Sequence, residues 1–206
     1  MENENFNINE IKEIKVILLG DSGVGKTNLI NVAVGIKFQE MLESTCSSSF
    51  VTKHFIKQNT RYTLNIWDTA GQENFRAMTK LFIKNSKIVI FVYAIDNKNS
   101  FNDLNYWIST TQSLLGEEAL FAIAGNKSDL YMNEKVKQKE AKDLADKIGA
   151  KFKIVSAKIN AKGFIDFLEE LLDDYIDNKE CDINDESFEI KKENFKKKSL
   201  KKKCCS

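Results

Sequence analysis

The stretch KVILLGDSGVGKT, residues 15–27, joins a short apolar run to a glycine-rich turn. An apolar run over Lys15–Leu19 indicates a buried strand, and the pattern GxxxxGK[ST] that follows it is that of a phosphate-binding P-loop. Its glycines let backbone N–H groups turn toward phosphate oxygens, while Lys26 brings a positive charge and Thr27 a hydroxyl suited to Mg²⁺. The alternative is a chance glycine-rich turn. We predict nucleotide contacts at Ser22, Gly23, Val24, Gly25, Lys26 and Thr27.

A second motif, Asp68-Thr69-Ala70-Gly71-Gln72, follows a later apolar segment. A carboxylate at a strand end suits Mg²⁺, which keeps much of its water shell, so Asp68 is a predicted metal ligand. Gly71 can offer its N–H to a γ-phosphate with no side chain in the way. Gln72 can both donate and accept hydrogen bonds, so we predict that it orients the attacking water and is the catalytic residue.

Two further motifs suit a guanine base. Asn126-Lys127-Ser128-Asp129 follows an apolar run, and one carboxylate, Asp129, can accept from both the ring N–H and the amine of guanine. Adenine would present an acceptor there, so the motif argues against ATP. Lys127 can lay its methylene groups on the base, and the backbone of Ser156-Ala157-Lys158 can reach the guanine carbonyl oxygen. A surface turn is the alternative for each motif alone.

The order of elements predicts an α/β fold of the P-loop NTPase class. A helix is expected at Thr27–Val34, and helical spacing of apolar residues recurs over 104–115 and 164–175. Strands that alternate with helices imply a six-stranded, mostly parallel sheet with helices on both faces and a ligand beyond the carboxyl ends of the strands. The strands are expected at Lys15–Leu19, Phe50–Ile56, Arg61–Trp67, Lys87–Ala94, Leu120–Gly125 and Phe152–Val155.

The composition favours no strongly charged partner. The chain has 206 residues, with 31 Lys and Arg against 30 Asp and Glu, which suits one globular domain plus a tail. We expect a monomer with no nucleic-acid partner. The four cysteines show neither a disulfide framework nor zinc spacing. Apolar runs reach about seven residues, far short of the roughly 20 of a membrane span, and the N-terminus lacks signal-peptide features, so we expect a cytoplasmic setting.

Four motifs in this order, each after a strand, resemble the Ras-like small GTPases over residues 13–176. The segment WDTAGQENF at 67–75, the P-loop sequence and the Cys-Cys tail are most similar to the Rab branch. The resemblance implies a Ras-like G domain that binds GTP or GDP with Mg²⁺ and acts as a switch in vesicle trafficking. It implies slow hydrolysis that a GTPase-activating protein accelerates, reloading by an exchange factor, and effectors that bind the GTP form.

The resemblance also implies roles for residues that otherwise read as loop or core positions. Thr45 stands where the family carries a switch threonine that completes the Mg²⁺ shell, and Phe38 stands where it places an aromatic ring against the base. Packing in the core is the alternative for Phe38. Rabs carry an aromatic patch that reads the switch state, here Phe50, Trp67 and Phe82, and ordinary core packing is again the alternative.

The tail resembles a Rab membrane anchor. We predict an N-terminal extension at 1–12, a G domain at 13–176 and a disordered tail at 177–206. Residues 191–203 hold eight Lys and one Glu and lead to Cys204-Cys205-Ser206. In Rabs both cysteines receive geranylgeranyl groups, which with the Lys run imply reversible anchoring to the cytosolic face of an intracellular membrane. The alternative is two idle thiols on a flexible tail.

Some positions depart from the Rab pattern. Cys46-Ser47-Ser48-Ser49-Phe50 replaces the usual Ile-Gly-Val-Asp-Phe, and the run SFVTK at 49–53 is similar to the endosomal Rabs. Asn74 replaces a usual Arg, which bears on contacts to regulators. Two other functions stay open at this point: a nucleotide-binding scaffold with negligible turnover, which the intact Gln72 argues against, and an ATP-using P-loop kinase or ATPase, which Asp129 argues against.

Overall fold

The computed structural model describes residues 10–42, 45, 49–71, 76–116 and 119–179. The chain divides into two compact units, Met1–Leu171 and Leu172–Ser206. The first holds the sheet, the helices packed on it and the start of a helix over residues 161–179. Of the second unit the structure describes residues 172–179, which are helical. In the described residues, no helix is both long enough and apolar enough to cross a membrane.

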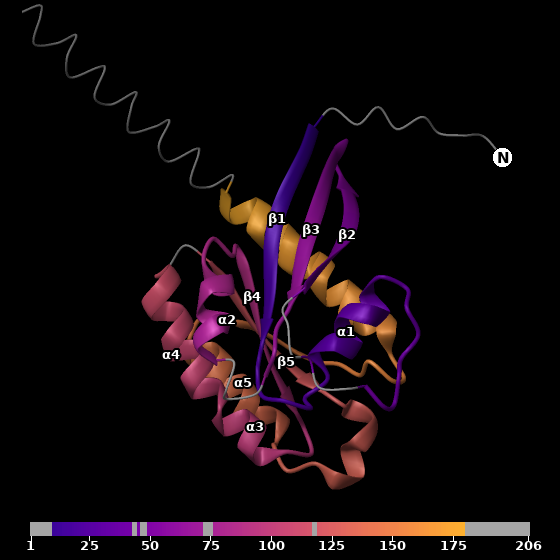
Figure 1. The fold of residues 1–206 in the computed structure, drawn as a ribbon, viewed down its shortest axis with the longest axis vertical. Coiled ribbons are helices and arrows are strands. Elements are labelled where there is room, and N and C mark those ends of the chain that lie inside the picture. Colours follow the sequence, from indigo (N-terminus) through magenta and orange to yellow (C-terminus); the bar gives the residue numbers. More distant parts are fainter. Residues whose placement is uncertain (1–9, 43–44, 46–48, 72–75, 117–118, 180–206) are drawn as a thin grey trace, which may run out of the picture. The chain divides into compact units, whose positions relative to one another are not determined.

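Within the described part of the chain, six strands form one sheet in the order β2-β3-β1-β4-β5-β6 (Figure 1). All neighbouring strands are parallel except β2 and β3, which form a hairpin. This arrangement confirms the predicted six-stranded, mostly parallel sheet. The strands are β1 (Glu10–Leu19), β2 (Ser49–Lys57), β3 (Thr60–Asp68), β4 (Ile88–Ala94), β5 (Leu120–Asn126) and β6 (Lys151–Ile154).

The first strand is longer than its apolar run. β1 begins at Glu10 rather than Lys15, because its backbone pairs with β3 from Glu10 opposite Thr60 to Ile17 opposite Trp67. Backbone pairing needs no apolar side chain, so the polar start of the strand carries no signal in the sequence. The β2–β3 hairpin closes through two residues with positive φ, Gln58 at 48° and Asn59 at 61°, as a tight two-residue turn requires.

Helices follow most strands. Three of them, α2, α3 and α5, were not predicted from the sequence. The buried residues of α5 are Ala141 and Ala145, so its apolar stripe is narrow and composed of small side chains. The helices are α1 (Lys26–Ala33), α2 (Arg76–Ile83), α3 (Lys98–Asn102), α4 (Leu104–Leu115) and α5 (Gln138–Lys147), with a 3₁₀ helix at Ser128–Asn133 and the helix over residues 161–179.

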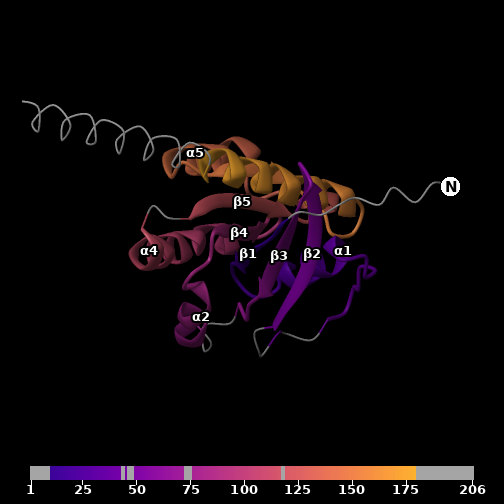
Figure 2. The same ribbon diagram turned by 90° about the horizontal axis from the view of Figure 1, so that it is seen from above.

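Apolar side chains on both faces of the sheet are buried. All seven residues of β4 are buried, as a central parallel strand covered on both sides requires. On one face, alternate residues of β1, β4 and β5 pack with Ile83 of α2, Trp107 of α4 and Ala141 of α5. The other face is covered by the first turns of the helix over residues 161–179, whose Phe164 and Phe167 are buried. Figure 2 shows α2 and α4 on the opposite side of the strands from these first turns, which are drawn in orange.

Parallel strands bring several loops to one edge of the sheet. The segments that follow β1, β3, β5 and β6 all leave from carboxyl ends of strands. All four of these strands run parallel to a neighbour on at least one side and share the direction of β4. The sequence motifs that follow them are therefore brought together by the topology of the sheet.

A first prediction concerns the core. Replacing the fully buried Trp107 by Ala leaves a large cavity among α4, β4 and β5, and should lower the free energy of unfolding by about 3–5 kcal/mol. The control is Leu114→Ala on the same helix, where the Leu side chain is 39% exposed. Urea unfolding of both variants at one fixed GDP concentration makes the comparison. Equal losses for the two variants would contradict this description of the core.

Candidate functional site

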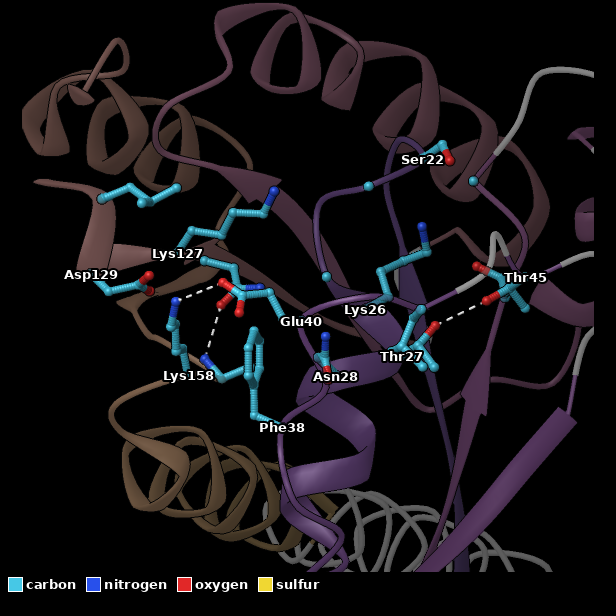
Figure 3. A pocket seen from close by; sticks show the side chains of 18 residues that line it. Ser22, Lys26, Thr27, Asn28, Phe38, Glu40, Thr45, Lys127, Asp129 and Lys158 are labelled. Carbon is cyan, nitrogen blue, oxygen red and sulfur yellow. Dashed lines mark hydrogen bonds and ion pairs between the residues drawn. The ribbon is translucent and has the colours of Figure 1, made fainter.

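A cavity of about 340 Å³ lies where the loops after β1, β3, β5 and β6 meet (Figure 3). Thirteen of the residues predicted to bind nucleotide or metal line it, although they come from four separate motifs and from the segment between α1 and β2. Those residues are Ser22, Gly23, Gly25, Lys26, Thr27, Phe38, Thr45, Gly71, Asn126, Lys127, Asp129, Ala157 and Lys158.

Lys26 is a buried cation at the base of this cavity. Its ammonium donates to the carbonyl oxygens of Gly20 and Asp21, each at 2.9 Å. Burial lowers the pKa of Lys26 from 10.5 to about 8, against the attraction of Asp68 and Asp21, which raises it. No carboxylate of the described residues is bonded directly to it, and a buried ammonium is costly, so a phosphate group beside it would be favoured.

Two glycines allow backbone segments to approach closely around the cavity. Gly25 has φ of 93°, and a Cβ there would lie 2.5 Å from Nδ2 of Asn126. A Cβ on Gly71 would lie 2.5 Å from the backbone of Asp21 and of Ser22. Neither position can accept a side chain without displacing a neighbour, so the P-loop backbone stays open toward a ligand and the loop after β3 lies directly against it.

Three oxygen-bearing side chains converge beside Lys26. The Thr27 hydroxyl donates to Oδ2 of Asp68 at 2.8 Å and lies 2.9 Å from the Thr45 hydroxyl, which is 3.5 Å from the same Asp68 oxygen. The other Asp68 oxygen, Oδ1, is buried and has no hydrogen-bond partner among the described residues. Burial raises the pKa of Asp68, and the Thr27 hydroxyl and Lys26 oppose that shift. Hard oxygen ligands of this kind fit Mg²⁺.

Asn126 joins three of the motifs. Its Nδ2 donates to the carbonyl of Val24 in the P-loop at 2.8 Å, and its Oδ1 accepts from the N–H of Ala157 at 3.3 Å. The side chain is buried. One carboxamide therefore holds the P-loop and the motifs after β5 and β6 in a fixed relation to one another.

Asp129 is held at the far end of the cavity by Ser156. The Ser156 hydroxyl donates to Oδ1 of Asp129 at 2.6 Å and accepts from the backbone N–H groups of Lys158 and Ile159, each at 3.2 Å. Ser156 is fully buried and does not line the cavity. Its place in the structure is thus behind Asp129, which it orients toward the cavity.

Phe38 forms part of the cavity wall near Asp129. The Lys158 ammonium lies 5.9 Å from the centre of its ring, and Figure 3 shows both side chains on the same side of the cavity as Asp129. Val24, by contrast, is buried with its side chain in the core, and only its backbone borders this region. Gln72, the predicted catalytic residue, and Cys204 and Cys205 lie outside the described residues.

Sequence reasoning missed part of the cavity wall. Two sequence features could have predicted these residues. Asn28 directly follows the P-loop threonine, and Glu40 and Leu42 are spaced two residues apart from Phe38, so in an extended segment they face the same side. Thr69 hydrogen-bonds the carbonyl of Leu18 at 2.7 Å and so anchors the loop after β3 to β1. The additional lining residues are Asn28, Glu40, Leu42, Thr69 and Leu130.

The three aromatic residues of the predicted effector surface lie in contact. The rings of Phe50 and Trp67 are stacked with centres 5.1 Å apart, and those of Trp67 and Phe82 are 5.3 Å apart. Phe50 is 52% exposed, whereas Trp67 and Phe82 pack partly against the core. Part of this cluster is therefore packed and part is open to solvent, and its role as an effector surface stays a prediction.

Comparison with known proteins agrees with this geometry. The Ras family model matches residues 15–176. The chain is 40% identical to human Ras-related protein Rab-22A over 148 residues, which is 72% of this chain and 76% of that protein. The chain belongs to the Rab branch of the Ras family. Ras-related protein Rab-21 of Geodia cydonium is 37% identical over 163 residues, 77% of this chain and 71% of that protein.

Membership in the Rab branch of the Ras family defines the general activity of this protein. It is a small GTPase that binds GTP and GDP, hydrolyses GTP and acts as a molecular switch in vesicle trafficking through regulators and effectors. The Ras-like fold predicted from the sequence is confirmed. Neither an ATP-using kinase nor a scaffold without turnover fits this membership.

A second prediction tests the base end of the cavity. Asp129→Asn replaces a double acceptor by one acceptor and one donor, so guanine should bind about 10- to 100-fold more weakly. Xanthine has a carbonyl in place of the guanine amine, so XDP should bind the variant better than the wild type. Competition of GDP, XDP and ADP against a fluorescent guanine nucleotide measures both effects.

The control for this variant is Asp143→Asn on the exposed face of α5, which makes the same charge change away from the cavity. Its preference for guanine should equal that of the wild type. If Asp129→Asn also keeps that preference, Asp129 does not read the base.

Proposed function

We propose that the cavity is the guanine nucleotide site of this Rab, with the phosphates at Lys26 and the base at Asp129. The observation that supports this most is that both side chains border one cavity, which also contains Phe38 and the backbone of Gly71. Lys26 and the P-loop N–H groups then bind the phosphates, Asp129 and Lys127 bind the base, and Ala157 and Lys158 close the base pocket.

We propose Thr27, Thr45 and Asp68 as the residues that hold Mg²⁺, either directly or through water. The unpartnered Oδ1 of Asp68 and the two neighbouring hydroxyls support this assignment. When bound, Mg²⁺ supplies positive charge to the β- and γ-phosphate oxygens. Thr45 follows the exposed segment 37–42, so its hydroxyl can sense whether a γ-phosphate is present.

In this proposal hydrolysis is an in-line attack of water on the γ-phosphate. Lys26 stabilises negative charge on the phosphate oxygens, the Gly71 N–H binds the γ-phosphate, and Gln72 orients the attacking water. Gly71 is buried against the P-loop, which puts its N–H on the side of the cavity where we propose that the phosphates bind. An arginine that further stabilises the transition state is expected from a GTPase-activating partner.

A third prediction addresses Gln72. Gln72→Leu removes the amide that orients water, so the single-turnover rate of GTP hydrolysis should fall at least about 10-fold, as for loss of a positioning group, while GTP affinity stays near that of the wild type. Gln112→Leu, at an exposed position of α4, is the matched control. A Gln72→Leu protein that hydrolyses bound GTP as fast as Gln112→Leu would remove Gln72 from the mechanism.

We further propose that residues 13–176 form the G domain and that the segment from 177 onward is a membrane tether. The Lys-rich run at 191–203 precedes Cys204 and Cys205, and two lipid chains, or one chain with a polybasic run, are needed for stable anchoring. Geranylgeranyl groups on both cysteines would hold the protein at the cytosolic face of a membrane. The run SFVTK at 49–53 supports an endosomal membrane.

A fourth prediction tests this tether. In cells, the double variant Cys204→Ser/Cys205→Ser should move from the membrane pellet to the soluble fraction, because it loses both attachment points for lipid. Cys181→Ser removes a thiol from the same tail and should leave the distribution unchanged. Fractionation followed by immunoblotting measures the split, and a double variant that pellets like the wild type would refute lipid anchoring at this pair.

A further inference from the structure

Residues 36–42 border one side of the cavity without forming a helix or a strand. Their side chains alternate as in an extended chain. Gln39 is exposed and Met41 is 95% exposed, while the residues on either side of them face the cavity. Which side chains face the nucleotide therefore depends on how the backbone at Gln39 is oriented. The residues of this segment that line the cavity are Phe38, Glu40 and Leu42.

Asn28 fixes that orientation. It lies in the first turn of α1, and its Nδ2 donates to the carbonyl oxygen of Gln39 at 2.8 Å. The N–H of Gln39 donates back to Oδ1 of Asn28 at 3.0 Å. A single hydrogen bond would let the chain rotate about it, but two bonds of opposite direction to one residue prevent that rotation. One side chain beside the phosphate site thus sets the direction of Phe38 and Glu40.

A second contact holds the same segment from the other side. The Lys158 ammonium lies 3.1 Å from Oε1 of Glu40 and 5.9 Å from the centre of the Phe38 ring. Lys158 belongs to the loop after β6, so this ion pair connects the segment to the base end of the cavity (Figure 3). Glu40 is 79% and Lys158 47% exposed at the side chain, so the pair contributes modestly and is sensitive to salt.

We propose that Asn28 and the Glu40–Lys158 pair form a two-point clasp that sets how fast the nucleotide leaves this Rab. The clasp holds Phe38 and Glu40 over the base end, so a departing nucleotide must first break at least one of its two contacts. This inference rests on the proposed assignment of the cavity as the guanine nucleotide site. The clasp acts at the base, so it slows release of GDP and GTP alike.

The test is the dissociation rate of fluorescent GDP and of a fluorescent non-hydrolysable GTP analogue in the presence of Mg²⁺. Asn28→Ala removes two hydrogen bonds and should raise both rates about 10-fold. Gln39→Ala is the matched control, because it removes an exposed side chain but keeps the N–H and carbonyl that Asn28 contacts. Its rates should stay within about two-fold of the wild type.

The ion pair gives an independent measurement. Glu40→Gln should raise both dissociation rates about three-fold at low salt, and its ratio to the wild type should fall toward one at about 0.5 M KCl, where the pair is screened. Glu170→Gln breaks a comparable exposed pair, to Lys153 at 2.6 Å, away from the cavity. That control should show neither the increase nor the salt dependence.

Several outcomes would overturn the clasp. One is an Asn28→Ala protein that folds and releases both nucleotides at the wild-type rate, and another is a rise confined to the GTP analogue, which would place Asn28 at the γ-phosphate. If Asn28→Ala does not fold, a Glu40→Gln rate equal to the wild type at low salt is decisive against it. Failure of the nucleotide site itself is distinguishable, because Asp129→Asn would then keep its preference for guanine.

Discussion

The buried ammonium of Lys26 is the constraint on which the rest of the site depends. It is held by two P-loop carbonyl oxygens, and no carboxylate of the described residues is bonded to it. Burial lowers its pKa to about 8. A bound anion would favour the charged form of this ammonium. The glycines of the P-loop and Gly71 leave the space that a phosphate needs. Desolvation of Lys26 therefore destabilises its charged form, and a phosphate bound in the proposed position would offset that effect.

The specificity of the site is built on buried hydrogen bonds rather than on exposed contacts. Asn126 holds the P-loop to the loop after β6, and Ser156 holds Asp129. Both side chains are buried and both connect segments that are distant in the sequence. Because a buried polar group that loses its partner is costly, these bonds keep Asp129 and the loop after β6 in a fixed position relative to the P-loop. The wall formed by residues 37–42 is different, since its contacts to Asn28 and Lys158 are largely exposed.

Much of this arrangement could be predicted from the sequence because it is local. A strand followed by GDSGVGKT, or by NKSD, places the motif at a strand end, and a parallel sheet then brings the ends together. The start of β1 at Glu10 was not predictable from hydrophobicity, because it depends on backbone pairing with β3. α5 was missed because it buries alanines. The contacts of Asn28 with Gln39 and of Glu40 with Lys158 join residues 11 and 118 positions apart, and nothing in the local sequence specifies them.

The central claim is that one guanine nucleotide occupies the cavity between Lys26 and Asp129. A crystal structure of the protein with GDP and Mg²⁺ tests it most directly. The account predicts a single nucleotide whose β-phosphate lies within hydrogen-bonding distance of the Lys26 ammonium and whose guanine N–H and amine donate to Asp129. Electron density that places the phosphates at Lys26 but the base away from Asp129, or that puts the nucleotide elsewhere on the protein, would contradict it.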